Sequence, residues 1–226
     1  MDHCRIEDLL DLNETIAASI FEGLEHPWEA LAKIHDWILA CGAVLDADDS
    51  YEKRGEDIWV AKDAHVFESA YLHGPLIIGH GAEVRHCAFI RGSAIVGEGA
   101  VVGNSTELKN VLLFNAVQVP HYNYVGDSIL GYKAHMGAGS ITSNVRSDKK
   151  NIIVHDEDTE YETGLRKFGA VLGDHAEVGC GSVLNPGTVI GRGSRVHPLS
   201  SVRRVVPAGC IHKDNGQITV IRQTDR

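Results

Sequence analysis

The chain has 226 residues, of which 43% are hydrophobic and 23% charged, a composition typical of a globular protein with a substantial core. Its formal net charge of −10 argues against broad contact with nucleic acid or an anionic membrane, because both are bound mainly through surplus Lys and Arg. The five cysteines form no C-x-x-C pair, the chain opens without a secretory signal, and no apolar run approaches the ~20 residues that span a bilayer. We therefore expect a soluble cytoplasmic protein with reduced thiols.

Two helices are expected near the start of the chain. Over residues 6–24, apolar side chains recur three or four positions apart, at Leu9, Leu12, Ile16, Ile20 and Leu24. A second helix is predicted to begin at Pro27 and to end at Gly42, with Trp28 and Trp37 packed against the rest of the fold. Residues 45–56 are polar enough to form a linker.

After the linker the sequence follows a six-residue period. Aliphatic or other apolar residues recur at Val60, Val66, Leu72, Ile78, Val84, Ile90, Val96, Val102, Leu108, Phe114 and Pro120, and again from Leu130 and from Leu172 to Val202. The position two residues earlier is usually Ala, Ser or Thr. Hexapeptide repeats are typical of a parallel β-helix, in which each hexad forms one side of a triangular coil. We therefore predict a mainly β fold: a left-handed β-helix over residues 58–226, preceded by a helical cap and linker over residues 1–57.

The repeat also predicts which residues lie above one another. Three hexads close a coil, so residues three hexads apart should stack at the strand spacing of ~4.8 Å. The period slips between Pro120 and Leu130, around "HYNYVGD", and disappears between Asn144 and Gly169. Because long excursions from a rigid scaffold are commonly functional, we expect a loop to leave the coil at each gap.

Arg91 and Lys109 are separated by three hexads, so they are predicted to stack on consecutive coils. Two cations ~5 Å apart repel by roughly 3 kcal/mol at an effective dielectric constant of 20. One interpretation is an anion clamp for a phosphate group. The alternative is that both side chains are solvated, with Glu107 as a partner.

His121 follows Pro120 where the repeat slips, and Tyr124 lies three residues further on. Histidine is the side chain best suited to accept a proton near neutral pH, so His121 is a candidate general base. The chain has thirteen histidines, and position alone does not distinguish this one.

Residues 91–150 carry a more specific signal. The pieces "RGSAIVGEGAVVGNSTELKN", "HYNYVGDSILG" and "GAGSITSN" resemble, without a gap, the acetyltransferase domain of the bifunctional bacterial N-acetylglucosamine-1-phosphate uridylyltransferase/glucosamine-1-phosphate acetyltransferase. The resemblance implies an acetyl-CoA-dependent enzyme, a homotrimer with the donor in a groove between subunits, and no metal requirement. It implies that Arg91, Lys109 and Tyr124 hold the sugar phosphate, and that Lys150 reaches the substrate from the long loop. His135 and Asn144 complete the expected substrate-binding residues. It also implies that His121 is the base and that acetyl-CoA lies along Ala138, Cys180 and Pro198.

The chain departs from the family pattern in several places. His135 stands where the family usually has an asparagine, "NVRSDKK" replaces a loop with tyrosine and glycine, and the insertion at residues 151–168 is longer. The segment 1–57 contains no glycine-rich strand-to-helix turn for a nucleotide, so we do not expect uridylyl transfer.

Three functions are consistent with these residues. The leading hypothesis is an N-acetyltransferase acting on an amino sugar phosphate or a nucleotide-linked amino sugar. A zinc carbonic anhydrase on the same fold would need three converging histidines, for which His80, His86 and His121 are the nearest candidates, although the first two fall on different sides of the coil. A non-catalytic hexapeptide protein that binds a sugar nucleotide or a partner enzyme is the third.

Overall fold

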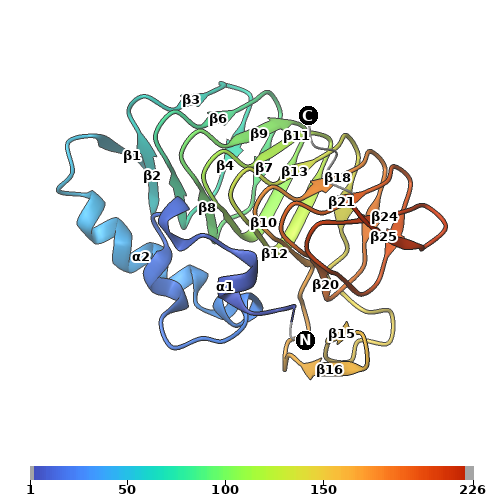
Figure 1. The fold of residues 1–226 in the computed structure, drawn as a ribbon. Coiled ribbons are helices and arrows are strands. Elements are labelled where there is room, and N and C mark those ends of the chain that lie inside the picture. The colour runs from blue at the N-terminus through green and yellow to red at the C-terminus, as the bar shows by residue number, and fades with distance from the viewer. Residues whose placement is uncertain (1–2, 222–226) are drawn as a thin grey trace.

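A computed structural model describes residues 3–221, and most of them coil into a three-sided prism (Figure 1). The fold class is confirmed: the chain is mainly β and forms the expected left-handed parallel β-helix of hexapeptide repeats. Successive coils pair in parallel through one strand on each side of the prism.

Each side of the prism is a ladder of short strands. The first side contains β2 (Ile58–Ala61), β5 (Leu76–Ile78), β8 (Ala94–Val96), the second halves of β10 (Glu107–Leu113) and β12 (Tyr124–Leu130), β17 (Ala170–Leu172), β20 (Thr188–Ile190) and β23 (Val205–Val206). The second contains β3 (His65–Val66), β6 (Glu83–Val84), β9 (Val101–Asn104), β11 (Gln118–His121), β13 (His135–Met136), β18 (Glu177–Val178), β21 (Arg195–Val196) and β24 (Cys210–His212), with β25 (Ile218–Val220) antiparallel at its end. The third contains β4 (Tyr71–Leu72), β7 (Phe89–Ile90), the first halves of β10 and β12, β14 (Ile141–Thr142), β19 (Val183–Leu184) and β22 (Ser201–Val202).

The interior follows the hexad rule. Ile78, Val84 and Ile90 are fully buried, as are the small residues Ala94 and Ala100. In later coils the small residue is a hydroxyl side chain that donates to a backbone carbonyl, for example Ser194 Oγ to Pro207 O at 2.6 Å. The buried hydroxyls of Ser182, Thr188 and Ser194 are thereby satisfied, whereas Ser200 Oγ is buried without a hydrogen-bond partner among the described residues.

Two expected inward positions are wrong. Val96, Leu113 and Leu130 lie in register, each step one position short of three hexads, because the chain takes only five positions from Leu108 to Leu113 and again from Val125 to Leu130. Phe114 therefore falls outside the prism, where its ring centroid lies 6.1 Å from that of Phe21. By the same shift Val119, and not Pro120, is the buried residue of β11.

The first expected helix is also wrong. Residues 6–24 form a single helical turn, α1 (Ile6–Leu9), and two 3₁₀ turns, η1 (Leu12–Glu14) and η2 (Ala18–Phe21). Bonds to the β-helix compete with helix continuation: Asp174 N donates to Leu9 O at 2.9 Å, and Asp11 N donates to Asp174 Oδ2 at 2.8 Å. Ile16 is 42% exposed, so the apolar spacing here did not mark one buried face.

The second helix extends beyond the expected end. A 3₁₀ segment, η3 (Pro27–Ala32), leads into α2 (Ile34–Leu45), and Gly42 is buried within α2. A Cβ on Gly42 would lie 2.2 Å from the ring of Trp59, so this glycine permits close packing and does not end the helix. Trp28 is buried as predicted, while Trp37 is partly buried and donates from Nε1 to Ser19 Oγ at 2.9 Å.

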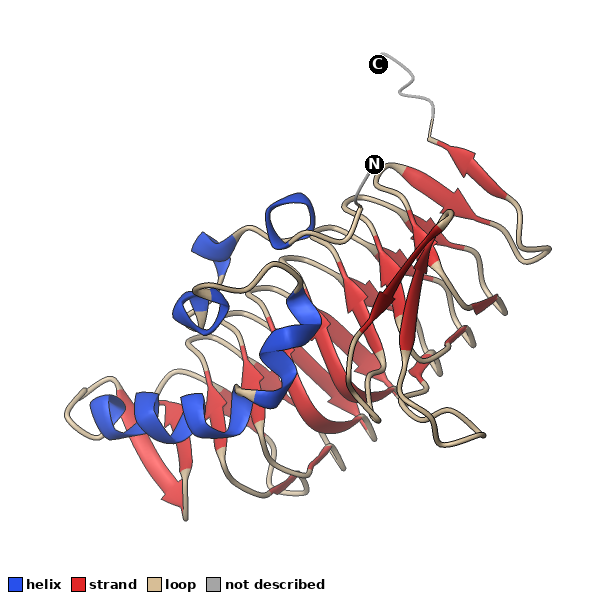
Figure 2. Cartoon of the chain, turned by 90° about the horizontal axis from the view of Figure 1, so that it is seen from below, coloured by secondary structure: helices blue, strands red, loops and turns tan. Residues whose placement is uncertain are grey.

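The helical segment lies along the first side of the prism, where α2 packs against β2, β5, β8 and β10 (Figure 2). The expected linker contains a strand, β1 (Tyr51–Gly55), which pairs antiparallel with β2 and covers the first coil. One hydrophobic cluster joins residues of the helical segment to the interior of the β-helix.

Of the two expected excursions, only the second exists. Between Ser143 and Gly169, which still bond to neighbouring coils, the chain leaves the prism and forms a hairpin of β15 (Ile153–Asp156) and β16 (Thr159–Glu162). At the first gap the chain turns tightly at Tyr122, whose φ is 51°, and continues directly from β11 into β12. The slip in the period is a shortened coil, not a loop.

Candidate functional site

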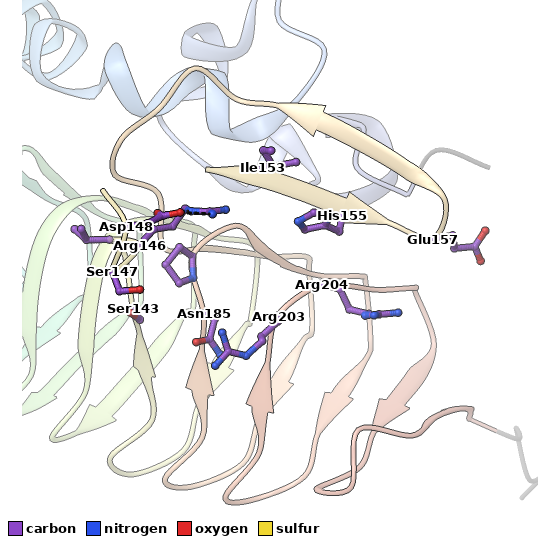
Figure 3. Close-up of a pocket in the computed structure, with 12 residues that line it drawn as sticks. Ser143, Arg146, Ser147, Asp148, Ile153, His155, Glu157, Asn185, Arg203 and Arg204 are labelled. Carbon is purple, nitrogen blue, oxygen red and sulfur yellow. Dashed lines mark hydrogen bonds and ion pairs between the residues drawn. The ribbon is translucent and has the colours of Figure 1, made fainter. Parts of the chain in front are cut away.

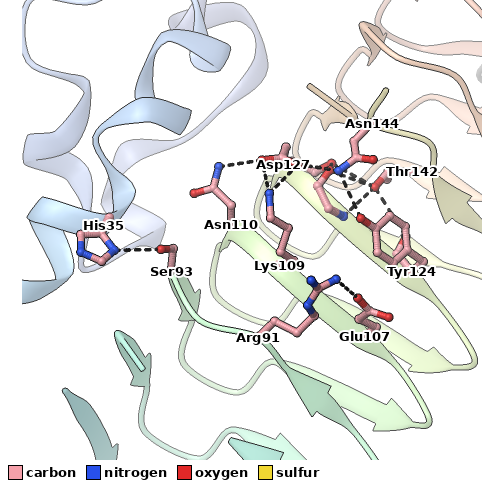
Figure 4. Close-up of polar contacts among 12 residues, drawn as sticks. His35, Arg91, Ser93, Glu107, Lys109, Asn110, Tyr124, Asp127, Thr142 and Asn144 are labelled. Atoms are coloured by element: carbon pink, nitrogen blue, oxygen red, sulfur yellow. Dashed lines mark hydrogen bonds and ion pairs between the residues drawn. The ribbon is translucent and has the colours of Figure 1, made fainter. Parts of the chain in front are cut away.

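Arg91 and Lys109 lie on the outer surface of the third side, on consecutive coils, as the three-hexad spacing predicted. β7 and β10 pair with Ile90 opposite Leu108, which places the two cations one above the other. Each has its own carboxylate (Figure 4): Arg91 Nη1 lies 2.8 Å from Glu107 Oε1, and Lys109 Nζ lies 3.0 Å from Asp127 Oδ1. The bond from Arg91 to Glu107 raises the pKa of the guanidinium. These acids offset the repulsion, so no bound anion is needed to explain the pair, and phosphate binding here stays a prediction.

Asp127 organises this row of side chains. It is only 4% exposed and accepts hydrogen bonds from Lys109 and Asn110 of the neighbouring strand β10 and from Asn144 in the loop after β14. Asn144 Nδ2 also donates to the Tyr124 hydroxyl at 3.1 Å. Burial, reinforced by the Asp127 carboxylate, raises the pKa of Tyr124.

The structure thus brings together Arg91, Lys109, Tyr124 and Asn144, four of the expected substrate residues. Sequence reasoning missed Asp127, the residue that connects three of them. The sequence signal for Asp127 is the shortened hexapeptide spacing around it. Asp127 lies at a corner with φ of 47°, in a coil that lacks one residue.

His121, Ala138, Cys180 and Pro198 form a column at the corner between the second and third sides. Gly139 N donates to His121 O at 3.0 Å, Gly181 N to Ala138 O at 2.9 Å, and Leu199 N to Cys180 O at 2.9 Å, which links the four consecutive coils. All four column residues are exposed. The chain places the expected base and the expected donor residues on one edge of the prism.

The remaining two expected residues lie elsewhere. His135 begins β13 on the second side, in register between Gln118 and Glu177. Lys150 is exposed on the excursion before the hairpin. Within residues 3–221, no hydrogen bond or ion pair connects either side chain to Tyr124 or His121.

A groove of about 750 Å³ lies between the hairpin and the last coils (Figure 3). We call it the hairpin groove; its lining comes from residues 143 and 145–148, from Ile153, His155 and Glu157 of the hairpin, and from Asn185, Pro186, Arg203 and Arg204 of the β-helix. The excursion after Ser143 and the corner after β19 thus face each other across it.

The charged residues of the hairpin groove differ in their pairing. Arg146 binds Asp148 through two hydrogen bonds, of 2.9 and 2.8 Å, and these hold the pKa of that carboxyl well below its usual range. Arg203 and Arg204 are exposed, and among the described residues no carboxylate pairs with either. Sequence reasoning missed the groove, although "VRRV" places two cations side by side at the end of a hexad.

Among residues 3–221, no helix is long and apolar enough to cross a membrane. In the same range no group of three His, Cys, Asp or Glu side chains is placed to hold a metal ion. His86 and His121 share a corner of the prism, two coils apart, whereas His80 follows β5 at another corner.

The fold defines the chain as a hexapeptide-repeat β-helix protein. Its sequence is similar to those of several bifunctional enzymes. The chain is 34% identical over 108 residues to a bifunctional sugar-1-phosphate nucleotidylyltransferase/acetyltransferase of Sulfurisphaera tokodaii, a match that covers 48% of this chain and 27% of that protein. It is 39% identical over 95 residues to the bifunctional protein GlmU of Methanococcus maripaludis, covering 42% and 23%. With GlmU of Bifidobacterium adolescentis the identity is 26% over 231 aligned residues, covering 84% and 46%.

These matches confirm the expected resemblance to the bifunctional enzymes. The chain spans less than half the length of these curated relatives. No protein-family model matches. Among solved structures, a perosamine N-acetyltransferase variant from Caulobacter crescentus, in complex with CoA and GDP-perosamine, is 17% identical with a TM-score of 0.40, over 84% of this chain and 67% of that one.

Proposed function

We propose that the chain is an acetyl-CoA-dependent N-acetyltransferase of amino sugar phosphates, with His121 as the general base. The observation that carries the proposal is the column in which exposed His121 precedes Ala138, Cys180 and Pro198 on consecutive coils. Tyr124 begins the next strand only three residues after His121, so one tight turn connects the expected donor edge to the expected acceptor row. The similarity to sugar nucleotidylyltransferase/acetyltransferases supports both assignments.

The chemistry needs a base and an oxyanion donor. An amine attacks the thioester carbonyl only when neutral, so His121 would accept the amine proton as the C–N bond forms. The tetrahedral oxyanion would be stabilised by a backbone N–H of the corner column. As the C–S bond breaks, the imidazolium would return the proton to the leaving thiolate, giving the N-acetyl sugar and free coenzyme A.

We further propose that the active form is a homotrimer with the site between subunits. Two large apolar side chains protrude from the same corner, Tyr122 at 65% and Leu199 at 80% exposure. Exposed apolar groups beside a polar site are typical of a surface that another subunit covers. Within the described residues, the His121 ring has no hydrogen-bond partner to orient it, which a neighbouring subunit would supply.

The direct test is release of free coenzyme A from acetyl-CoA, measured with a panel of amino sugars and their 1-phosphates. We expect turnover on at least one phosphorylated amino sugar and a stoichiometric N-acetyl product by mass spectrometry. Absence of turnover across the panel, with the protein folded and trimeric, would favour a non-catalytic binding protein.

A further inference from the structure

We propose that the hairpin groove is a phosphate-binding site distinct from the Arg91–Lys109 row. The first support is charge. The lining contains three arginines and two acids, in a chain whose net charge is −10. Arg146 is neutralised by Asp148, so the remaining charge of the lining is that of Arg203 and Arg204 against the single acid Glu157.

The second support is that the walls of the groove are held in place. Gly187 has φ of 83°, and a Cβ there would lie 2.8 Å from Ile152 Cγ2 and 3.0 Å from Ile153 O. The hairpin therefore packs directly on the corner after Pro186, with Ile152 fully buried beneath it. Asn185 is fixed too, since its Nδ2 donates to Ser201 Oγ at 3.0 Å and to Val202 O at 2.8 Å.

The third support is the direction of the side chains. In Figure 3 the guanidinium of Arg203 extends toward Asn185, whereas Arg204 extends the other way, below His155 and Glu157. The two arginines thus serve opposite halves of the groove. The Arg203 half is also lined by Ser143 and Ser147, whose hydroxyls are suitable donors to phosphate oxygens.

These features select the ligand chemistry. A guanidinium matches two oxygens of a phosphate with parallel hydrogen bonds, and a groove of about 750 Å³ has room for a diphosphate together with an organic group. A metal cation is disfavoured because Asp148 is already bound to Arg146, which leaves Glu157 as the one other acid of the lining, together with two arginines. The phosphate could belong to coenzyme A or to a phosphorylated sugar acceptor, which are the two phosphate-bearing molecules of the proposed reaction.

Calorimetric titration of the full chain with inorganic pyrophosphate tests the site without any turnover. We expect saturable binding that Arg203→Gln weakens by about tenfold or more, because one charge-assisted pair of hydrogen bonds is lost. Arg195→Gln is the matched control: Arg195 is 57% exposed on the second side and paired with Glu177, and its loss should leave binding unchanged. Equal weakening by both substitutions, or no binding by the parent chain, would overturn the proposal.

Competition then identifies the source of the phosphate. Displacement of pyrophosphate by coenzyme A but not by glucosamine-1-phosphate would assign the groove to the donor, and the reverse would assign it to the acceptor; either result supports the site. If neither molecule displaces pyrophosphate, a substrate role for the groove is wrong. Since the readout is binding, it stands or fails separately from catalysis by His121.

Discussion

The two pairs of cations on this protein differ in whether their members form ion pairs with acids. Arg91 and Lys109 are stacked on consecutive coils, and each is bonded to an acid; Arg203 and Arg204 are neighbours in sequence, and among the described residues neither forms an ion pair with an acid. A stack of cations in a solenoid therefore does not by itself indicate an anion site. Whether the adjacent coil supplies a carboxylate is the deciding feature.

The largest expected effect tests whether catalysis takes place at the corner that carries His121, next to the Arg91–Lys109 pair. His121→Ala should lower kcat by ~10²–10⁴, because the proton of the amine loses its acceptor. His86→Ala is the control, since His86 is exposed on the same corner two coils away and contacts Ser69. Steady-state kinetics in which both variants lose the same activity would remove His121 from the role of base.

The second prediction concerns removal of the acids that are bonded to Lys109 and Arg91. Asp127→Ala should lower the free energy of unfolding by about 3 kcal/mol, because Lys109, only 27% exposed, loses its partner together with two amide bonds. Glu107→Gln should cost less than about 1 kcal/mol, since Arg91 is 48% exposed and water replaces the acid. Urea unfolding monitored by circular dichroism measures both, and similar losses would contradict the difference in burial.

A third substitution tests the wall of the hairpin groove. Gly187→Ala should cost about 1–2 kcal/mol for the left-handed backbone, plus the displacement of the hairpin, and should weaken pyrophosphate binding. Gly193→Ala has the same backbone penalty, with φ of 63°, but its Cβ would meet no atom within 4 Å. Equal stability and equal pyrophosphate affinity in the two variants would show that the hairpin does not depend on this contact.

The smallest expected effect is a dependence on pH near Arg204. Burial lowers the pKa of His212 below 6.5, and the charges of His197 and Arg204 contribute in the same direction. The neutral form is therefore favoured by folding, so this contribution to stability is complete above about pH 6.5 and is lost as the pH falls through the folded-state pKa. Melting temperatures measured from neutral to mildly acidic pH should show this loss, and Arg204→Gln should move it to slightly higher pH; a shift to lower pH would contradict this assignment.

The β-helix could be predicted from the sequence because its rule is local: an inward aliphatic residue and a small residue two positions earlier repeat in nearly every hexad. The prediction failed where one residue is missing from a corner, because Phe114 and Leu113 are both apolar and only the register distinguishes them. The prediction for the helical segment failed for a different reason. Its backbone bonds to Asp174, 163 residues from Asp11, and no local pattern contains that information.

The candidate site was predictable to a similar extent. Spacing placed Arg91 above Lys109, and the resemblance supplied Tyr124 and Asn144. Neither identified Asp127, since an acid at a corner looks like any solvated turn residue until the strands are paired. The hairpin groove needed the tertiary structure, because its walls come from three separate segments of the chain, within 143–157, 185–186 and 203–204, that have no shared period.

The bonds from the first residues to the late coils affect how the protein is made. Asp11 pairs with Asp174, and His3 donates to Asp156 at 3.0 Å, across separations of 163 and 153 residues, whereas most coils contact only their neighbours. Contacts this distant form late, because the intervening chain must first be ordered. During synthesis residues 3–11 therefore leave the ribosome before the coils that they contact, and they reach their final position only after Asp174 has emerged. Until then the part of the prism around Gly131 and Asp174, against which Leu10 and Asp11 lie, lacks its cover, and nascent chains are exposed to association there.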